Sequence, residues 1–210
     1  MSRYTRVSLM AAVMWLAACS SKPVHYYTLL SPPEVSRSPV TTSPFLIDVL
    51  PVDLPEPLDQ PQFVVRQNDS GTVAVLDGER WVGPLGAEMR SALSVHLSEQ
   101  LGTQDISGLP APADAQVLRV KIQVRRLDAW PGRQVQLEAG WSLSFAGDAD
   151  KARLVCRRRF DVPAAAGYPA LVQAQRRAID ALAQQIAKDA RRWSASRHSN
   201  CTPPTEPSVS

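Results

Sequence analysis

The chain has 210 residues, of which 44% are hydrophobic and 20% charged, and its formal net charge is +3. This is the composition of a globular protein, and it excludes disorder throughout the chain. Three cysteines are too few for a disulfide-rich scaffold or a four-cysteine zinc site, and no apolar run is long enough for a transmembrane helix.

Residues 1–18 are typical of a bacterial signal peptide. A short start with two arginines precedes an apolar run of about ten residues, which is too short to span a bilayer. The run ends in Leu16-Ala17-Ala18-Cys19, and small residues before a cysteine match a lipoprotein signal. We therefore expect cleavage before Cys19 and acyl chains on this residue. A coincidental cysteine after an ordinary secretory signal is the alternative.

Several acyl chains on Cys19 would anchor the mature chain stably, whereas a single chain binds only marginally. Ser20 follows the cysteine, in place of the aspartate that retains lipoproteins at the inner membrane, so the inner leaflet of the outer membrane is expected. About four residues separate the anchor from the first predicted strand, which is a reach of roughly 14 Å. No cofactor is expected beyond the covalent acyl chains.

The first part of the mature chain predicts short strands separated by proline-rich connections. β-branched, aromatic and alternating residues favour strands at residues 24–30, 45–50, 62–66 and 72–76. The nearly continuous apolar run at 45–50 is typical of a strand buried on both sides. Four prolines in residues 51–61 predict an extended loop, and Asn-Asp-Ser-Gly at 68–71 predicts a hairpin turn.

Two amphipathic helices and three long strands follow. A spacing of four between large apolar residues predicts a helix over residues 81–101, with Pro84 in its first turn and Gly102 after its end. Alternation with a period of two predicts three antiparallel strands at residues 117–127, 134–145 and 153–162. One face of this meander should be buried and the other exposed to solvent, and we call the exposed face the wet side. A second helix is expected at 169–193 and a disordered tail at 194–210. Residues 19–193 should form a single α+β domain, with both helices packed on a mostly antiparallel sheet.

Charge is unevenly distributed along the chain. Residues 19–118 hold 5 Lys and Arg against 12 Asp and Glu, whereas residues 119–210 hold 16 against 8. Several of these cations share the wet side of the predicted meander, and they are Arg119, Lys121, Arg125, Arg157 and Arg159. They could form a surface for an acidic protein partner or for phosphates, although solvated arginines that protect a sheet would give the same pattern. Because we expect the chain to be exported from the cytoplasm, we do not expect it to bind nucleic acid.

Cys156 and Cys201 remain in an oxidising compartment once Cys19 is lipidated, and they could form a disulfide. Cys156 lies on the apolar side of its strand, whereas Cys201 lies in a polar tail. An unpaired, buried Cys156 is therefore the alternative.

Motifs of catalysis are absent from the sequence. It has no G-x-S-x-G, no P-loop, no dinucleotide fingerprint and no H-E-x-x-H, and none of the three histidines has a second ligand at metal spacing. Asp53, Glu56 and Asp59 could form a paired-acid site, but scattered surface acids are the more usual explanation. We expect neither an enzyme nor a metal site.

Three groups of residues together resemble the PqiC/YmbA family of ABC-type transport auxiliary lipoproteins. Tyr26-Tyr27-Thr28-Leu29 follows the cysteine closely. Leu54-Pro55 precedes Leu58-Asp59-Gln60-Pro61-Gln62 and Val65-Arg66, and Arg80-Trp81 with Pro84-Leu85 opens the leucine-spaced helix. The resemblance covers residues 19–193. Gly83 departs from the pattern, which leaves the start of the helix open.

The resemblance implies an outer-membrane lipoprotein that works with an MCE-domain protein of the inner membrane, in a system linked to lipid movement and envelope integrity. It implies a docking role without catalysis, and a homo-oligomeric ring would suit the ring-shaped MCE assemblies. The residues expected at the docking surface, besides the five cations, are Leu58, Asp59, Pro61, Gln62, Arg66, Arg80 and Trp81. For Trp81, packing of the helix against the sheet in the core is the favoured role, and partner contact is the alternative. Two other functions stay open: a periplasmic lipid carrier with an apolar pocket, and an envelope hydrolase or peptidoglycan-binding lipoprotein.

Overall fold

The computed structural model describes residues 23–31, 42–148, 152–197 and 200–203. The expected signal peptide, Cys19 and the tail after residue 203 lie outside these ranges. The elements are β1 (His25–Tyr27), β2 (Leu46–Val49), the short 3-10 helix η2 (Glu56–Leu58), β3 (Gln62–Arg66), β4 (Val73–Trp81), α2 (Leu85–Leu101), β5 (Val117–Trp130), β6 (Gln134–Phe145), β7 (Leu154–Pro163) and α3 (Tyr168–Ser196).

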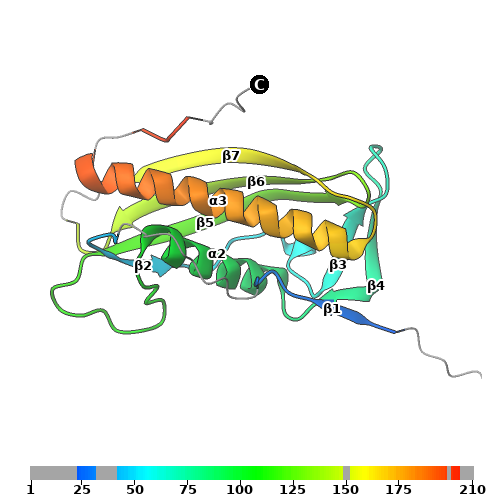
Figure 1. Ribbon diagram of the computed structural model, residues 1–210, viewed down its shortest axis with the longest axis horizontal. Coiled ribbons are helices and arrows are strands. Elements are labelled where there is room, and N and C mark those ends of the chain that lie inside the picture. Colours follow the sequence, from blue (N-terminus) through cyan, green and yellow to red (C-terminus); the bar gives the residue numbers. More distant parts are fainter. Residues whose placement is uncertain (1–22, 32–41, 149–151, 198–199, 204–210) are drawn as a thin grey trace, which may run out of the picture.

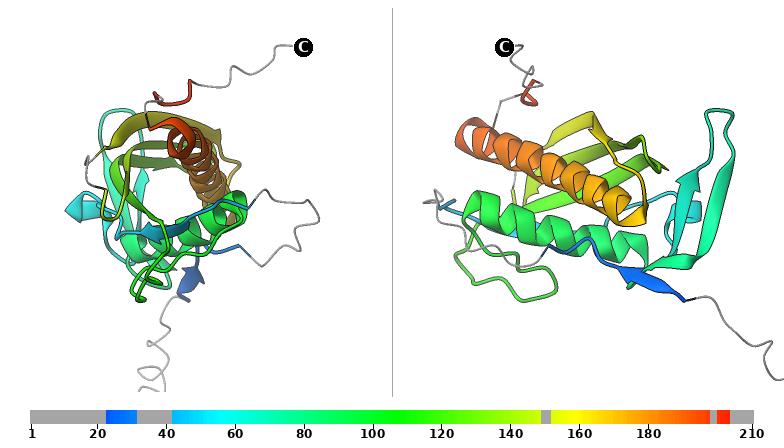
Figure 2. Two further views of the ribbon diagram at one scale, coloured as in Figure 1. Left: turned by 90° about the vertical axis from the view of Figure 1, so that its left-hand side faces the viewer. Right: turned by 45° about the vertical axis from the view of Figure 1, so that its right-hand side comes forward.

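A four-stranded sheet, which we call the large sheet, forms the centre of the molecule in the order β2-β5-β6-β7. β5, β6 and β7 are antiparallel neighbours, while the edge strand β2 pairs parallel to β5. α2 and α3 lie side by side on one side of this sheet, and both begin at the same end of the molecule (Figure 1, Figure 2). Within the described ranges, neither long helix packs on the other side of the large sheet, which we call the side without helices (Figure 2).

A three-stranded sheet, the small sheet, closes the end at which both helices begin (Figure 1). Its order is β1-β4-β3, with β1 parallel and β3 antiparallel to β4. The pairing with β3 is irregular between Gln62 and Phe63, because residues 77–79 are extra on β4. β1 therefore joins only the last three residues of β4, and the described chain starts beside this end.

The predicted fold class is confirmed: two long helices pack on a mostly antiparallel arrangement of strands in a single α+β domain. The apolar residues spaced by four in α2 are all buried, and they are Leu85, Met89, Leu93, Leu97 and Leu101. β6 shows the expected alternation of buried and half-exposed residues along most of its length. The core lies between the helices and the large sheet, where these periodicities bring the apolar sides together.

The first helix begins at Leu85, not at residue 81 as its spacing predicted. β4 continues through Trp81 because the Trp81 N–H donates to the Pro61 carbonyl at 2.7 Å, and the Val82 N–H donates to that of Tyr27 at 2.9 Å. Pro84, which has no N–H, then stands at the N-cap. Tertiary pairing has therefore extended the strand through residues that the helical spacing included.

Two other expectations need correction. β2 is not buried on both sides, since Leu46 and Asp48 are half-exposed on the side without helices. Residues 194–196, which were expected in a disordered tail, are the last residues of α3. Arg197 then ends the helix in a left-handed conformation with φ of 58°, and its guanidinium lies 3.8 Å from the ring centre of Phe145.

Candidate functional site

The segment that contains Leu58, Asp59 and Pro61 is held against the first turn of α2. Asp59 Oδ1 accepts a hydrogen bond from the Gly86 N–H at 2.9 Å, which satisfies one of the free N–H groups at the start of the helix. A Cβ atom on residue 86 would lie 3.1 Å from the same oxygen, so glycine permits this close approach. Asp59 and Pro61 remain exposed, and the segment is an ordered surface.

Trp81 belongs to the core rather than to a partner surface. Its side chain is only 2% exposed and packs on Phe63, with ring centres 4.3 Å apart. Phe63 in turn contacts Tyr27, with ring centres 5.1 Å apart. Of the two roles weighed for Trp81, the structure has packing in the core, where the indole joins the small sheet to the body of the molecule.

Arg66 and Arg80 make contacts within the chain. The Arg66 Nε donates to Asp128 Oδ1 at 2.7 Å, which ties β3 to the end of β5. The Arg80 Nε donates to the Asp77 carbonyl at 3.0 Å, and the register places Arg80 between Gln62 of β3 and Tyr26 of β1. All of these side chains belong to the end of the molecule that the small sheet closes.

The Tyr-Tyr-Thr-Leu motif is fixed by one residue from each helix. The Glu88 carboxylate of α2 accepts hydrogen bonds from the Thr28 hydroxyl at 2.7 Å and the Leu29 N–H at 2.8 Å. The Arg176 guanidinium of α3 donates to the Thr28 carbonyl at 2.7 Å. Burial raises the pKa of Tyr27 to about 12, and the nearby Glu79 carboxylate contributes. Sequence reasoning missed Glu88 and Arg176, because their partners are far away along the chain.

The five predicted cations of the large sheet lie on its side without helices. On β5, Arg119 pairs with Asp48 and Lys121 with Asp53, each at 3.5 Å. On β7, Arg159 pairs with Asp161 at 2.9 Å, and this hydrogen bond raises the pKa of the guanidinium. Within the described residues, the exposed Arg125 and Arg157 have no ion-pair partner.

A shallow groove runs between the two rows of cations. The register places Gly140 of β6 between Gln123 and Arg157, and Ser142 between Lys121 and Val155. Because β6 presents small residues here, the longer side chains of β5 and β7 stand on either side of it. The groove has a volume of about 230 Å³. The sequence thus predicted the cations, but the predicted residues form two separate surfaces, one on this sheet and one at the end of the molecule.

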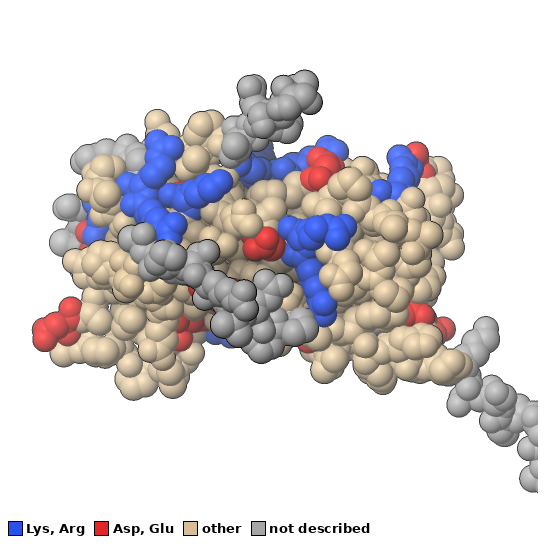
Figure 3. Space-filling model, in the orientation of Figure 1, with Lys and Arg blue, Asp and Glu red and all other residues tan. Residues whose placement is uncertain are grey.

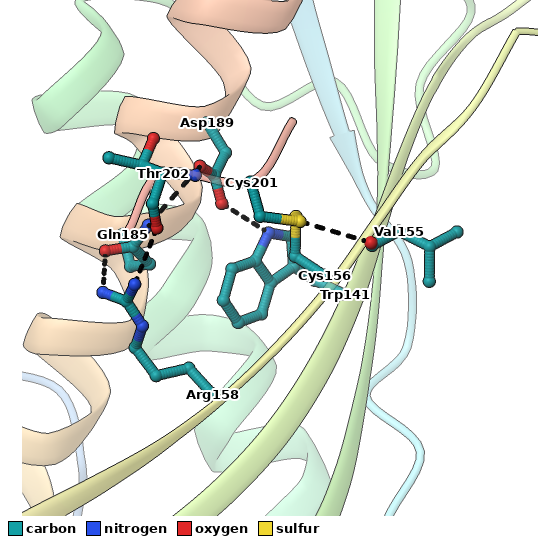
Figure 4. The surroundings of a disulfide bond; sticks show 8 residues. All are labelled: Trp141, Val155, Cys156, Arg158, Gln185, Asp189, Cys201 and Thr202. Atoms are coloured by element: carbon teal, nitrogen blue, oxygen red, sulfur yellow. Dashed lines mark hydrogen bonds between the residues drawn. A yellow bond between two sulfur atoms is a disulfide. The ribbon is translucent and has the colours of Figure 1, made fainter. Parts of the chain in front are cut away.

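A disulfide joins Cys156 of β7 to Cys201, with the Cα atoms 5.8 Å apart. It fastens residues 200–203, which we call the strap, beside α3 (Figure 4). The buried Asp189 accepts hydrogen bonds from the Thr202 N–H at 2.6 Å and the Trp141 Nε1 at 3.2 Å. The Thr202 carbonyl accepts from Arg158 and Gln185. Of the two alternatives left open for the cysteines, the structure has the paired one.

The helix side of the molecule is also basic. Figure 3 shows Lys and Arg side chains gathered over α3, with few acidic side chains among them. The exposed members on α3 are Arg177, Lys188, Arg191 and Arg192. The positive second half of the chain is therefore spread over both sides of the molecule, and charge alone does not single out one surface.

Two of the three acidic residues weighed as a catalytic pair have partners elsewhere in the chain. Asp53 is engaged with Lys121 and Asp59 with the start of α2. No group of three or more His, Cys, Asp or Glu that could hold a metal ion occurs within the described ranges. Among the same residues, no helix combines the length and apolarity needed to cross a membrane.

The family model of the ABC-type transport auxiliary lipoprotein component matches residues 27–187. The chain belongs to this family. The match includes the Tyr-Tyr-Thr-Leu motif from its second residue onward, α2, the three long strands and α3 as far as residue 187. It confirms the resemblance read from the sequence. A comparison with curated proteins finds no match.

Solved structures share the fold of this lipoprotein. An uncharacterized protein matches with a TM-score of 0.59 at 20% identity, over 80% of this chain and 99% of its own. Protein XCC0632 from Xanthomonas campestris matches with a TM-score of 0.56 at 16% identity, over 75% of this chain and 95% of its own. At these identities the likeness shows a common fold.

Proposed function

We propose that this chain is a non-enzymatic lipoprotein of the outer membrane, where it serves an MCE-type system that moves lipid between the two membranes and supports envelope integrity. The family match over residues 27–187 carries the proposal. The family is one of transport auxiliary lipoproteins; the MCE partner and the outer membrane are the finer steps that we add.

The sequence before β1 supports the membrane anchor. Acyl chains on Cys19 would hold the chain at the bilayer, and Ser20 favours the periplasmic face of the outer membrane. Pro23, the first described residue, is four positions from this cysteine. The end closed by the small sheet would therefore lie near the lipid, leaving the rest of the domain to reach toward a partner.

The wet side of the large sheet is the surface that we propose for the MCE-domain partner. Arg125 and Arg157 are exposed there without an ion-pair partner among the described residues, and the groove along β6 lies between their strands. Unpaired cations favour an acidic surface, which would also orient the encounter. A homo-oligomeric ring is part of the same proposal, since it would repeat this surface around the axis of a ring-shaped partner.

A lipid carrier is disfavoured by the packing of the interior. The cavity lined by Phe63, Trp81 and Leu171 has a volume of only about 10 Å³, which is room for one water molecule and not for an acyl chain. Mass spectrometry of the gently purified protein checks this point. A docking lipoprotein should carry no lipid beyond its covalent anchor, whereas stoichiometric bound lipid would favour the carrier.

Fractionation of the Cys19→Ser variant tests the anchor. The variant should leave the outer-membrane fraction for the soluble periplasm and fail to restore envelope integrity in a strain that lacks the protein. An unchanged distribution and unchanged function would contradict the lipoprotein assignment.

Co-purification with the MCE-domain protein tests the docking surface. Arg125→Glu with Arg157→Glu should reduce recovery of the partner about tenfold or more, because two cations become two anions at the contact. Lys188→Glu, an exposed change on the helix side, is the matched control and should retain the partner. Equal recovery from both variants would rule out this side of the sheet.

Arg80→Ala tests the second surface, at the end of the molecule. If residues 58–62 and Arg80 contact the partner, this variant should fold normally and lose co-purification. Unchanged co-purification would exclude them from the contact and leave their role as the structural one described above.

A further inference from the structure

Exposed large hydrophobic side chains gather at the end of the molecule closed by the small sheet. Nine such residues occur in the described part of the chain. Six of them belong to this sheet or directly flank it, and they are Val24, Tyr26, Leu30, Val73, Val75 and Val82. The remaining three, Val95, Leu109 and Val155, are isolated on other elements. Scattered apolar residues need no explanation, but a cluster of this kind marks an interaction surface.

The small sheet has an inner and an outer side, and the apolar residues of β4 lie on the outer one. Phe63 and Val65 of β3 are buried against the body, and the residues paired with them, Leu76 and Ala74, share that side. Val73 and Val75 alternate with these and are exposed, with Val75 at 51%. They therefore lie on the outer side of the small sheet, which closes one end of the molecule (Figure 1).

Tyr26 and Val82 extend the cluster toward the start of the described chain. Tyr26 is 63% and Val82 67% exposed. The register sets Tyr26 beside Arg80, and β1 begins one residue after Val24. A tyrosine next to an arginine suits a membrane interface, because the ring can lie among the acyl chains while the hydroxyl and guanidinium reach headgroups.

The short segment between Cys19 and Pro23 indicates what covers this cluster. Four positions separate Cys19 from Pro23, so even a fully extended segment keeps Pro23 within roughly 14 Å of the acylated residue, and β1 begins two residues later. This step rests on the proposed lipid anchor. A surface so close to the acylated residue is within reach of the bilayer that holds the anchor.

We propose that the outer side of the small sheet, together with Val24, Tyr26 and Val82, contacts the lipid surface that holds the anchor. The apolar side chains enter the boundary between headgroups and acyl chains, and the covalent anchor supplies most of the affinity. The contact adds orientation: the long axis points away from the membrane. The strap bonds to Asp189, which lies 21 residues after the first residue of α3, so it stands roughly 30 Å farther from the bilayer along the helix axis.

Fluorescence quenching on vesicles tests the contact. Full-length acylated protein is reconstituted into vesicles of phosphatidylethanolamine and phosphatidylglycerol that contain spin-labelled lipid. An environment-sensitive dye is attached to a cysteine introduced by Val75→Cys, and the matched controls are Val155→Cys and Leu109→Cys, at positions that are also exposed. The dye at position 75 should be quenched about twofold or more, and the dyes at 155 and 109 should not be.

The outcomes separate this inference from the anchor itself. Protein that floats with the vesicles but shows no quenching at position 75, or equal quenching at all three positions, overturns the membrane contact and leaves the lipoprotein assignment intact. Protein that does not float with the vesicles contradicts the anchor, and the contact is rejected with it.

Hydrogen exchange gives a second readout without a label. Vesicles should slow exchange in β3 and β4 of the acylated protein relative to detergent. Val73→Asp with Val75→Asp should abolish this protection while the protein still floats, because two carboxylates would have to enter the interface. Val155→Asp should keep the protection. Equal protection in both variants would overturn the proposal.

Discussion

The two ends of the described chain are secured by different chemistry. At the small sheet, the motif around Thr28 is held by noncovalent contacts, which are the pairing of β1 with β4, the burial of Leu29 and the hydrogen bonds to Glu88 and Arg176. At the opposite end, the strap is held by a disulfide and by Asp189, which is fully buried. The first attachment can open locally at modest cost in free energy, whereas the second closes a large loop covalently. The difference suits a protein that adapts to a surface at one end and stays rigid at the other.

Removal of the disulfide should have the largest effect. Cys156→Ala with Cys201→Ala should lower the free energy of unfolding by about 3–4 kcal/mol, since the bond constrains the unfolded chain over a separation of 45 residues. Urea denaturation measures the change, and wild-type protein kept reduced is the control and should lose a similar amount. Equal midpoints for the oxidised and reduced wild type would contradict the covalent role of the strap.

Asp189→Asn should lower the free energy of unfolding by about 2–3 kcal/mol. Both carboxyl oxygens of Asp189 accept hydrogen bonds from N–H groups, and the asparagine NH₂ would replace one of these acceptors with a second donor. Asp180→Asn, at a half-exposed position of the same helix, should change stability little. In the variant without the disulfide, the cost of Asp189→Asn should fall by about 1 kcal/mol, because the Thr202 N–H no longer has to be satisfied there. If the free-energy costs of Asp189→Asn and of removing the disulfide simply added, the hydrogen bonds of Asp189 and the disulfide would stabilise the fold independently.

Glu88→Ala should cost about 2 kcal/mol, since the Thr28 hydroxyl and the Leu29 N–H lose their acceptor. The effect should be local, with faster hydrogen exchange at residues 24–30 and little change around the strap. Glu99→Ala on the same helix is the control. If exchange rose equally at both ends of the molecule, the contrast drawn above would be wrong.

The smallest effect depends on pH and concerns Asp105, which links the loop after α2 to β2. Burial opposes its ionisation, but hydrogen bonds from Ser107, Ser94 and Val49 outweigh burial and lower its pKa below the usual 3.8. The ionised form therefore stabilises the fold above about pH 4, and this contribution is lost as the pH falls through the lowered pKa. Asp105→Asn should melt at a lower temperature at pH 7, and the gap should narrow below pH 4. A constant gap would contradict the assignment.

The helices and strands with a regular spacing of apolar residues could be predicted from the sequence. The leucines of α2 and the alternating cations of β5 and β7 were placed on the correct sides, because burial of one side imposes those periods. The family could also be read from short motifs, although most motif residues proved to be structural. Asp59, for example, fixes the start of α2, and Trp81 packs in the core.

Contacts between distant segments could not be read from the sequence. Nothing local marks Glu88 or Arg176 as partners of Thr28, and Asp189 looks like any polar residue on a helix. The helix start was misplaced because Trp81 fits the apolar spacing of α2, yet its N–H is used by a carbonyl of the η2–β3 connection. Tertiary hydrogen bonding determined these positions, and propensity alone does not reveal it.

The strap also has a consequence for how the protein is made. The bacterial cytoplasm keeps thiols reduced, and Cys201 is synthesised after every element of the domain. If the chain is exported as we propose, oxidation follows translocation and completes maturation. Protein produced in a reducing cytoplasm without residues 1–18 would be purified with free thiols at both positions, and would need an oxidant to form the Cys156–Cys201 bond.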